Sequence, residues 1–354
     1  MSSRKETITL EIFLKRAWPL LLCGAVLILG VSACLIYLTI SGKIRSGSIQ
    51  TEPANAGTSS TVGALAPRHL DGVLVPSDQV ALQAYAVMID NLPEARPLSG
   101  PAKANLVIEA PVEGGITRFM LLFDATSTAA EIGPVRSARN YFVDWAYSLG
   151  AVYAHVGGSP SGLELIRLLT TFRNLDEMSS GSYFWRSTAR SRPHNTYTDI
   201  ASLKKAALNK EWAAGALLPW SYATSSLQGT TQLISVPYEG SYYVEWRFST
   251  STGKYQRYQD DKIQKDADGT YVTASNVVVV LTDATVVDSV GRLNLRTKGN
   301  GTAVLYRNGE KYNLTWSRQV GEWIKFKNAG GNDAVFEPGT TWVEIFTDAS
   351  LFNS

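Results

Sequence analysis

Residues suited to chemistry gather between positions 90 and 195, and the densest group is Glu109-Ala-Pro-Val-Glu-Gly-Gly-Ile-Thr-Arg118. Its two glutamates, Glu109 and Glu113, are suited to acid/base catalysis or to binding a divalent cation. Gly114 and Gly115 would allow the backbone to approach a bound molecule closely. The same pattern also fits an ordinary hairpin turn with solvated carboxylates, since a glycine pair is a common turn signal.

A second group, Gly133-Pro-Val-Arg-Ser-Ala-Arg139, leads into a segment with helical spacing. Arg136 and Arg139 are three residues apart and would be neighbours on one helical face. If the helix begins near Ser137, the two arginines flank its N-terminus, where backbone N–H groups already favour anions. Arginine adds bidentate recognition of carboxylate or phosphate, although two ordinary ion pairs would explain the pattern equally well.

Two histidines lie in further polar segments, His155-Val-Gly-Gly-Ser159 and Pro193-His-Asn195. A histidine at the end of a strand can transfer protons, but most single histidines are hydrogen-bonded structural residues. Ser159 lacks the Gly-x-Ser-x-Gly frame of a strained nucleophile turn. His155 and His194 have no third ligand at a spacing diagnostic of zinc, so the sequence predicts no metal site, and nothing indicates a cofactor.

The elements that must position these residues follow from the apolar pattern. Apolar runs at 85–89, 105–110, 118–123 and 151–156 predict buried strands, and the spacing at 142–149, 162–169 and 202–214 predicts helices. This alternation predicts an α+β or α/β domain over residues 68–218, which carries the candidate site. Residues 219–354 alternate strand patterns with turn signals and are expected to form a β-rich domain.

The stretch from Ala17 to Ile40 has no charged residue, and about 20 apolar residues suffice for a transmembrane helix. Four basic residues precede it, namely Arg4, Lys5, Lys15 and Arg16. Counting lysine and arginine alone, this flank is the more basic one, so residues 1–16 should stay cytoplasmic. The rest of the chain would lie outside the cell membrane, beyond a flexible linker rich in Ser, Thr, Gly and Pro at residues 41–67.

The same segment allows a second fate. Val31-Ser-Ala-Cys34 is similar to the cleavage site of a bacterial lipoprotein, in which Cys34 would carry the lipid. The apolar run continues to Ile40, however, whereas a signal peptide's apolar region ends at its cleavage site. Either fate tethers the chain to the membrane.

The two cysteines, Cys23 and Cys34, both lie in this apolar segment, so the exported part has no disulfide. The net charge of +2 does not indicate nucleic-acid binding.

Several segments together are similar to a known family. They are Met88-Ile-Asp-Asn91, Ala95-Arg-Pro97, the groups ending at Arg118, Arg139 and Ser159, Pro193-His-Asn195, Asn276-Val-Val-Val279, Gly301-Thr-Ala-Val304 and Gly339-Thr-Thr-Trp-Val343. The chain thus resembles the YerB-like family of bacterial lipoproteins, which combines a domain of unknown function (number 3048) with a C-terminal companion domain. The resemblance implies an extracytoplasmic, membrane-tethered protein in two parts, and it implies no reaction.

We therefore expect a cleft that binds an anionic ligand of the cell envelope. The expected ligand-binding residues are Asp90, Asn91, Arg96, Gly114, Gly115, Thr117, Arg118, Arg136, Ser137, Arg139, Gly157, Gly158, Ser159 and Asn195. One alternative is an envelope hydrolase or phosphotransferase, with Glu109 or Glu113 and His155 or His194 transferring protons and the arginines stabilising negative charge. Another is a scaffold for an envelope protein. Convergence of these residues in space would favour the first two hypotheses.

Overall fold

The computed structural model describes residues 64–212, 220–224, 229–230 and 233–352. All of them belong to one compact unit, Val62–Ser354. The predicted tail, the apolar segment 17–40 and Cys34 lie outside the described residues, and none of the helices in the described ranges is long and apolar enough to cross a membrane. The unit begins within the predicted linker, since β1 (Leu65–Pro67) pairs with β2 (Leu74–Pro76).

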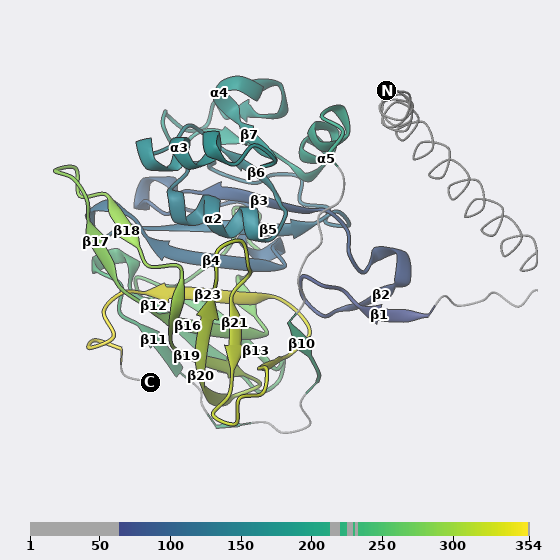
Figure 1. Ribbon diagram of the computed structural model, residues 1–354, viewed down its shortest axis with the longest axis vertical. Coiled ribbons are helices and arrows are strands. Elements are labelled where there is room, and N and C mark those ends of the chain that lie inside the picture. Colours follow the sequence, from purple (N-terminus) through teal and green to yellow (C-terminus); the bar gives the residue numbers. More distant parts are fainter. Residues whose placement is uncertain (1–63, 213–219, 225–228, 231–232, 353–354) are drawn as a thin grey trace, which may run out of the picture. The chain divides into compact units, whose positions relative to one another are not determined.

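A ten-stranded sheet forms the centre of this unit (Figure 1). In spatial order its strands are β21 (Lys325–Lys327), β20 (Glu310–Arg318), β19 (Gly299–Arg307), β16 (Asn276–Leu281), β23 (Thr341–Phe346), β4 (Leu106–Pro111), β5 (Thr117–Asp124), β3 (Ala84–Ile89), β6 (Val152–His155) and β7 (Asn174–Asp176). Strand β23 pairs in parallel with both β16 and β4. The two halves of the chain therefore share one sheet, which the predicted boundary between residues 218 and 219 does not interrupt.

The remaining strands form smaller sheets. The five-stranded sheet consists of β11 (Leu233–Val236), β12 (Val244–Ser249), β13 (Lys254–Gln259), β14 (Lys262–Ile263) and β15 (Thr273–Ala274). The other pairs are β8 (Trp185–Arg186) with β9 (Thr196–Tyr197), β10 (Ser221–Tyr222) with β22 (Val335–Phe336), and β17 (Ala284–Val286) with β18 (Leu293–Leu295). Most of the five-stranded sheet is antiparallel hairpin, as expected from its turn-rich sequence.

Within the described ranges, the α-helices all lie before residue 210. The α-helices are α2 (Asn140–Ser148), α3 (Pro160–Leu168), α4 (Glu177–Ser180) and α5 (Ile200–Asn209). The 3-10 turns are η1 (Ser77–Gln79), η2 (Pro93–Ala95), η3 (Pro101–Lys103), η4 (Glu113–Gly115), η5 (Gly181–Tyr183) and η6 (Gly240–Tyr242). Strand–helix alternation up to α5 gives the predicted mixed α and β layer, followed by a β-rich part.

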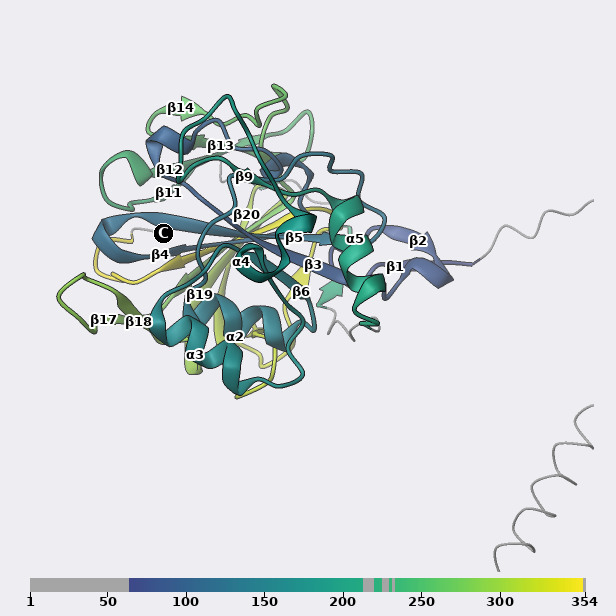
Figure 2. The same ribbon diagram turned by 90° about the horizontal axis from the view of Figure 1, so that it is seen from above.

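The large sheet separates two hydrophobic cores, because successive side chains of a strand point to opposite faces. On β3, Tyr85, Val87 and Ile89 face α5 and the five-stranded sheet. Ala86 and Met88 face α2 and the inner residues of β19 and β20. Figure 2 shows α2 and α3 on one side of the large sheet and β12 and β13 on the other.

The apolar pattern predicted these elements well. The runs at 85–89, 105–110, 118–123 and 151–156 are confirmed as β3, β4, β5 and β6, and the helices are α2, α3 and α5. A hairpin turn at Asn308 and Gly309 joins β19 to β20, and both residues have positive φ angles, 46° and 76°. This is the backbone that a two-residue hairpin turn requires, and Asn-Gly is a favoured sequence for it.

Asp266 joins the two halves at a second point and yields a prediction. Its buried carboxylate accepts hydrogen bonds from the backbone N–H groups of Gly100 (3.0 Å) and Ala102 (3.1 Å). Burial raises the pKa of Asp266 to about 6. The folded chain then binds more protons than the unfolded chain between about pH 4 and 6, so its free energy of unfolding should fall as the pH rises through this range.

We expect Asp266→Asn, which keeps a hydrogen-bond acceptor, to make the free energy of unfolding less dependent on pH. The decrease between pH 4 and 7 should become smaller by an amount on the order of 2 kcal/mol. Urea denaturation from pH 4 to 7 measures it, with the exposed Asp78→Asn as the control. A variant with the same pH slope as the wild type would show that Asp266 does not titrate in this way.

Candidate functional site

The candidate residues lie where several parallel strands end. Strands β3, β4 and β6 run in the same direction, because β5 is antiparallel to both of its neighbours and β6 is parallel to β3. Asp90 and Asn91 follow β3, η4 follows β4, and Thr117 and Arg118 begin β5. All therefore lie at one edge of the sheet, the carboxyl edge, where open α/β sheets commonly bind ligands.

Three arginines meet at this edge. Arg118 is 4% exposed, and its Nη1 donates a hydrogen bond to the carbonyl oxygen of Ser137 at 2.7 Å. Within the described ranges, Arg118 forms no ion pair with a carboxylate, and its Nε has no hydrogen-bond partner. Burial, together with the neighbouring guanidinium groups of Arg139 and Arg136, lowers the pKa of Arg118 to about 10. The site thus holds more positive charge than its own residues neutralise.

Two carboxylates balance part of this charge. Arg139 is buried and forms a bidentate ion pair with Glu113, with 3.0 Å between Nε and Oε2. Asp90 is also buried, and its Oδ2 lies 3.0 Å from Nε of Arg136 and 2.7 Å from Nδ1 of His194. We call Asp90, Glu113, Arg118, Arg136, Arg139 and His194 the arginine site. It contains three guanidinium groups and two carboxylates.

The N-terminus of α2 opens onto the arginine site. Arg139 is the N-cap residue, its side chain caps no backbone N–H, and the first turn has no acidic residue. A cation at a helix N-terminus opposes the helix dipole, whereas an anion there is favoured. By contrast, Ser159 caps the neighbouring helix α3 by accepting a hydrogen bond from the N–H of Gly162 at 3.1 Å. Ser159 is therefore a helix cap.

A chain of buried polar side chains leads inward from the same edge. Asn91 Nδ2 donates to Oγ1 of Thr117 at 2.7 Å, and this hydroxyl donates to Oε1 of Glu109 at 2.6 Å. Glu109 is fully buried, and its other oxygen pairs with the guanidinium of Arg257 on β13. Both carboxylate oxygens are thus engaged away from solvent, which assigns Glu109 to the framework of the fold.

Glu344 on β23 completes this buried group. The parallel register places it directly opposite Glu109, and its Oε1 lies 3.9 Å from Nε of Arg257. Oε1 of Glu344 also accepts from the indole N–H of Trp246 at 2.8 Å, and Oε2 accepts from the hydroxyl of Tyr238 at 3.2 Å. Burial raises the pKa of Glu344 well above its usual range, and the charge of Glu109 raises it further. A neutral Glu344 leaves one cation and one anion, so the group is balanced.

The sequence analysis missed Arg257 and Glu344, since both belong to the β-rich half. The inward positions of β13 are Tyr255, Arg257 and Gln259, which alternate with less buried residues. A charged residue at an inward strand position needs a buried partner. This was the signal available in the sequence, although it does not identify the partner.

Other predicted residues have structural roles. His155 is fully buried, with Nε2 2.6 Å from Oδ1 of Asn174 and Nδ1 2.7 Å from the carbonyl oxygen of Gly157. It therefore lacks the free ring nitrogen that proton transfer would need. Asn195 accepts a hydrogen bond from Arg186. A Cβ on Gly115 would lie 2.4 Å from Oε2 of Glu239, so a protein side chain covers this glycine.

Gly157 lies in open space, whereas Gly158 packs against Leu163 and Ala138. The glutamates do not form a cation site, because Glu109 faces Arg257 and Glu113 faces Arg139. In the part of the chain that the structure describes, no group of three His, Cys, Asp or Glu residues could hold a metal ion.

The buried group makes a stability prediction. Arg257→Met leaves Glu109 and Glu344 opposite each other without a counterion and should lower the free energy of unfolding by about 3–5 kcal/mol. Adding Glu109→Gln and Glu344→Gln should restore much of this loss. Urea denaturation measures both changes, and Arg247→Met, at an exposed ion pair with Glu245 on β12, should cost less than about 1 kcal/mol. Equal stability of Arg257→Met and the wild type would contradict the assignment.

Comparisons with known proteins agree with this architecture. Two family models match the chain, "Protein of unknown function (DUF3048) N-terminal domain" at residues 70–213 and the corresponding C-terminal domain at residues 234–343. A protein of Bacillus subtilis (strain 168) named "Putative lipoprotein YerB" is 31% identical over 288 residues, which cover 79% of this chain and 86% of the relative. A crystal structure of the YerB protein from Bacillus subtilis matches with a TM-score of 0.73 and 29% identity, covering 80% of this chain and 97% of that chain. The chain therefore belongs to the DUF3048 family, to which the sequence motifs had pointed.

Proposed function

We propose that this protein is tethered to the outside of the cell membrane and binds an anionic ligand of the cell envelope at the arginine site. The observation that carries the proposal is Arg118, a buried guanidinium that forms no carboxylate ion pair among the described residues and lies beside two further arginines. A ligand with a phosphate or carboxylate group would supply the missing negative charge. It would also complement the uncapped N-terminus of α2.

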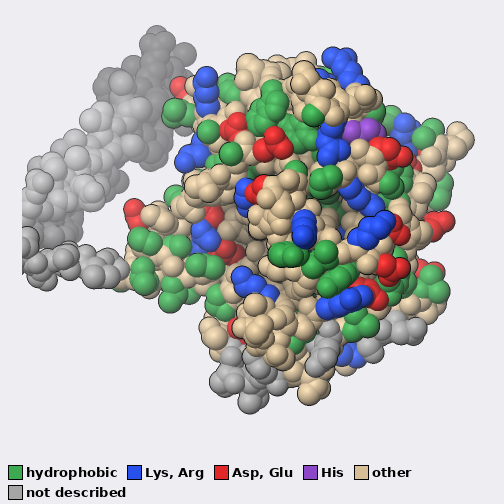
Figure 3. Space-filling model, turned by 180° about the vertical axis from the view of Figure 1, so that it is seen from behind, with side chains coloured by type: hydrophobic (Ala, Val, Ile, Leu, Met, Phe, Trp, Pro, Cys, Tyr) green, Lys and Arg blue, Asp and Glu red, His purple; other side chains and the backbone are tan. Residues whose placement is uncertain are grey.

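The side chains that could touch such a ligand are those at the rim of the site. The side chains of Arg136, Glu113 and His194 are 20%, 25% and 17% exposed, whereas Arg118 and Arg139 lie behind them. The buried arginines then act through their charge, which is screened less than a charge at the surface. Figure 3 shows Lys and Arg interspersed with Asp and Glu over one face of the molecule. This mixture favours recognition by a local site over a broad field of one sign.

The location rests on the N-terminal sequence and on the Bacillus relative. The relative's name includes the word lipoprotein, which supports the alternative in which Cys34 carries a lipid. The charge-free stretch from Ala17 to Ile40 supports a membrane-spanning anchor. Both alternatives place the DUF3048 domains on the outer side of the membrane, where envelope ligands are found.

Anion binding can be tested on the full chain by thermal shift with inorganic pyrophosphate and inorganic phosphate. A ligand that binds the folded state stabilises it by RT ln(1 + L/Kd), where L is the free ligand concentration, so the melting temperature rises with the logarithm of this concentration once it exceeds Kd. Arg136→Ala should weaken this binding at least tenfold, because Arg136 is the most exposed guanidinium of the site. Arg167→Ala, at an exposed ion pair on α3, is the matched control and should bind like the wild type.

An unchanged affinity in Arg136→Ala would refute the arginine site as the location. No stabilisation by any anion would favour the third hypothesis, in which the β-rich half holds an envelope protein.

One observation favours an enzymatic alternative. Nδ1 of His194 is oriented by Asp90, and Nε2 has no hydrogen bond within the described ranges, as in a histidine prepared for proton transfer. The arginines beside it could stabilise charge on a transferred phosphoryl group. In this alternative His194 is the acid or base, and the buried Glu109 takes no part.

The enzymatic alternative predicts release of phosphate from pyrophosphate or from p-nitrophenyl phosphate by the wild-type chain. His194→Gln should then lower the rate by about 10²–10⁴-fold. Anion binding should persist in this variant, because the three arginines remain. A wild-type chain that binds these compounds without turnover would exclude the reaction for them and leave the binding function.

A further inference from the structure

A pocket lies beside the segment that follows β3, away from the arginine site. It has a volume of about 390 Å³ and lies between η2 with its following residues and the hairpin of β13 and β14. One wall consists of Pro93, Arg96, Pro97 and Leu98, and the other of Gln259, Asp260, Lys262, Ile263, Gln264 and Lys265. Its volume is in the range of pockets that bind small molecules.

The buried Arg257 fixes two amide groups in the wall formed by the β13–β14 hairpin, those of Gln259 and Gln264. Its Nη1 donates to Oε1 of Gln259 at 3.0 Å and to Oε1 of Gln264. Arginine has donors only, so both amide oxygens must face it, and the amide nitrogens must face away from it. The nitrogen of Gln259 makes a long 3.5 Å contact with the carbonyl oxygen of Ser241, whereas that of Gln264 has no partner in the described part of the chain. Gln264 therefore offers a free donor to the pocket.

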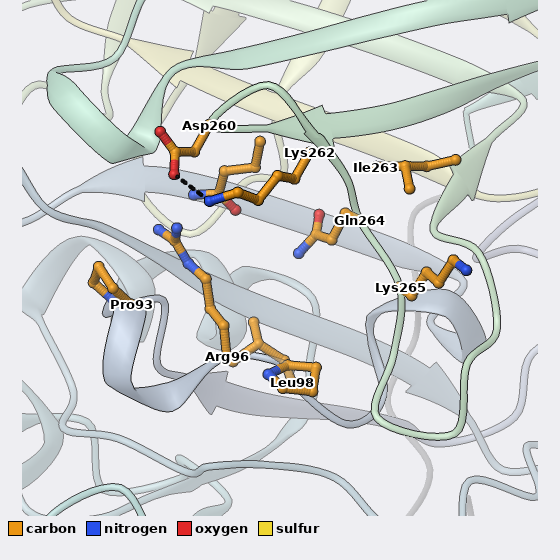
Figure 4. A pocket seen from close by; sticks show the side chains of 10 residues that line it. Pro93, Arg96, Leu98, Asp260, Lys262, Ile263, Gln264 and Lys265 are labelled. Carbon is orange, nitrogen blue, oxygen red and sulfur yellow. Dashed lines mark hydrogen bonds and ion pairs between the residues drawn. The ribbon is translucent and has the colours of Figure 1, made fainter.

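Arg96 offers a second donor from the opposite wall. Its Nη2 donates to the carbonyl oxygen of Asn91 at 2.9 Å and its Nε to the side-chain oxygen of Asn91 at 3.3 Å, which holds the guanidinium in place. The aromatic ring of Tyr242 lies 5.2 Å from it. Nη1 of Arg96 makes no hydrogen bond with any described residue. Figure 4 shows Arg96 and Gln264 on opposite walls of the pocket, with the guanidinium of Arg96 pointing toward Asp260 and Lys262.

The charges around the pocket are mainly positive. Lys262 and Lys265 lie at its rim, and Asp260 pairs with Lys262 at 3.2 Å between Oδ2 and Nζ. Together with Arg96, these lysines give the pocket lining three cationic side chains and one carboxylate, that of Asp260. Pro93, Pro97, Leu98 and Ile263 supply apolar walls. A ligand that fits carries an acceptor-rich anionic group and an apolar part.

We propose that this pocket binds a small organic carboxylate of short-peptide size, with its carboxylate held by Arg96 and its carbonyl oxygen by the amide of Gln264. A planar guanidinium matches a carboxylate, and amide N–H groups match peptide carbonyl groups. The nearby Asp260 opposes a doubly charged phosphate more than a singly charged carboxylate. The site is distinct from the arginine site, since Asp90 faces the arginines and Asn91 faces Arg96.

The test is isothermal titration calorimetry of the full chain with acetyl-alanyl-alanine and with its C-terminal amide. The free acid should bind at least ten times more tightly than the amide. Arg96→Gln should lower the affinity for the acid at least tenfold. Ile263→Glu should do the same by repulsion, and it should leave the fold intact because Ile263 is exposed on the hairpin. Arg247→Gln, which does not line the pocket, is the matched control and should bind like the wild type.

Several results would overturn the proposal. They are equal affinity for the acid and the amide, no binding of either, and unchanged binding by Arg96→Gln and Ile263→Glu. Displacement of the peptide by inorganic phosphate at equal affinity would refute the carboxylate preference. Arg96→Gln should keep the pyrophosphate binding expected at the arginine site, so the two proposals can fail separately.

Discussion

The guanidinium of Arg257 stabilises two glutamates that the large sheet places side by side. Glu109 and Glu344 are direct partners on neighbouring parallel strands, a placement that is unfavourable for two like charges. Arg257 reaches them from the five-stranded sheet and is surrounded by the rings of Trp342, Phe119 and Trp246, at 4.8, 5.3 and 5.8 Å from its Cζ to the ring centroids. The junction of the two halves of the chain, the pairing of β23 with β4, therefore depends on a residue from a second sheet.

Both proposed sites depend on this buried group. On one side, Arg257 orients Gln259 and Gln264 in the wall of the pocket. On the other side, Glu109 holds Thr117, and Thr117 holds Asn91, which fixes the chain just after β3. That short segment carries Asp90 for the arginine site and Arg96 for the pocket. A change that disturbs Arg257 should thus affect both sites, whereas a change at either rim should affect one.

Local sequence patterns were sufficient for the strands and helices, because these depend on hydrophobic periodicity over a few residues. The meeting of Asp90 and Arg118 was also predictable, since Asp90 follows β3, Arg118 begins β5, and both positions lie at one edge of the sheet. Arg136 and Arg139 precede helix α2 instead, and no strand position indicated where they would lie. Pairing over long separations was not predictable. Nothing near Glu109 indicates a partner in β13, and nothing near His155 shows that Asn174 and Gly157 engage its ring. The neighbourhood of His194 likewise does not show that its Nε2 makes no hydrogen bond with any described residue.

The alternation of side chains explains why one short segment can serve two sites. Met88 belongs to the core beneath α2, and Ile89 belongs to the core beneath the five-stranded sheet. Continuing this alternation, Asp90 contacts Arg136 and His194, whereas Asn91 contacts Arg96 and Thr117. Thr117 and Arg118 divide in the same way on β5. Ligands at the two sites would therefore act on the same backbone segment from opposite sides. The end of β3 is thus the segment through which binding at one site could change binding at the other.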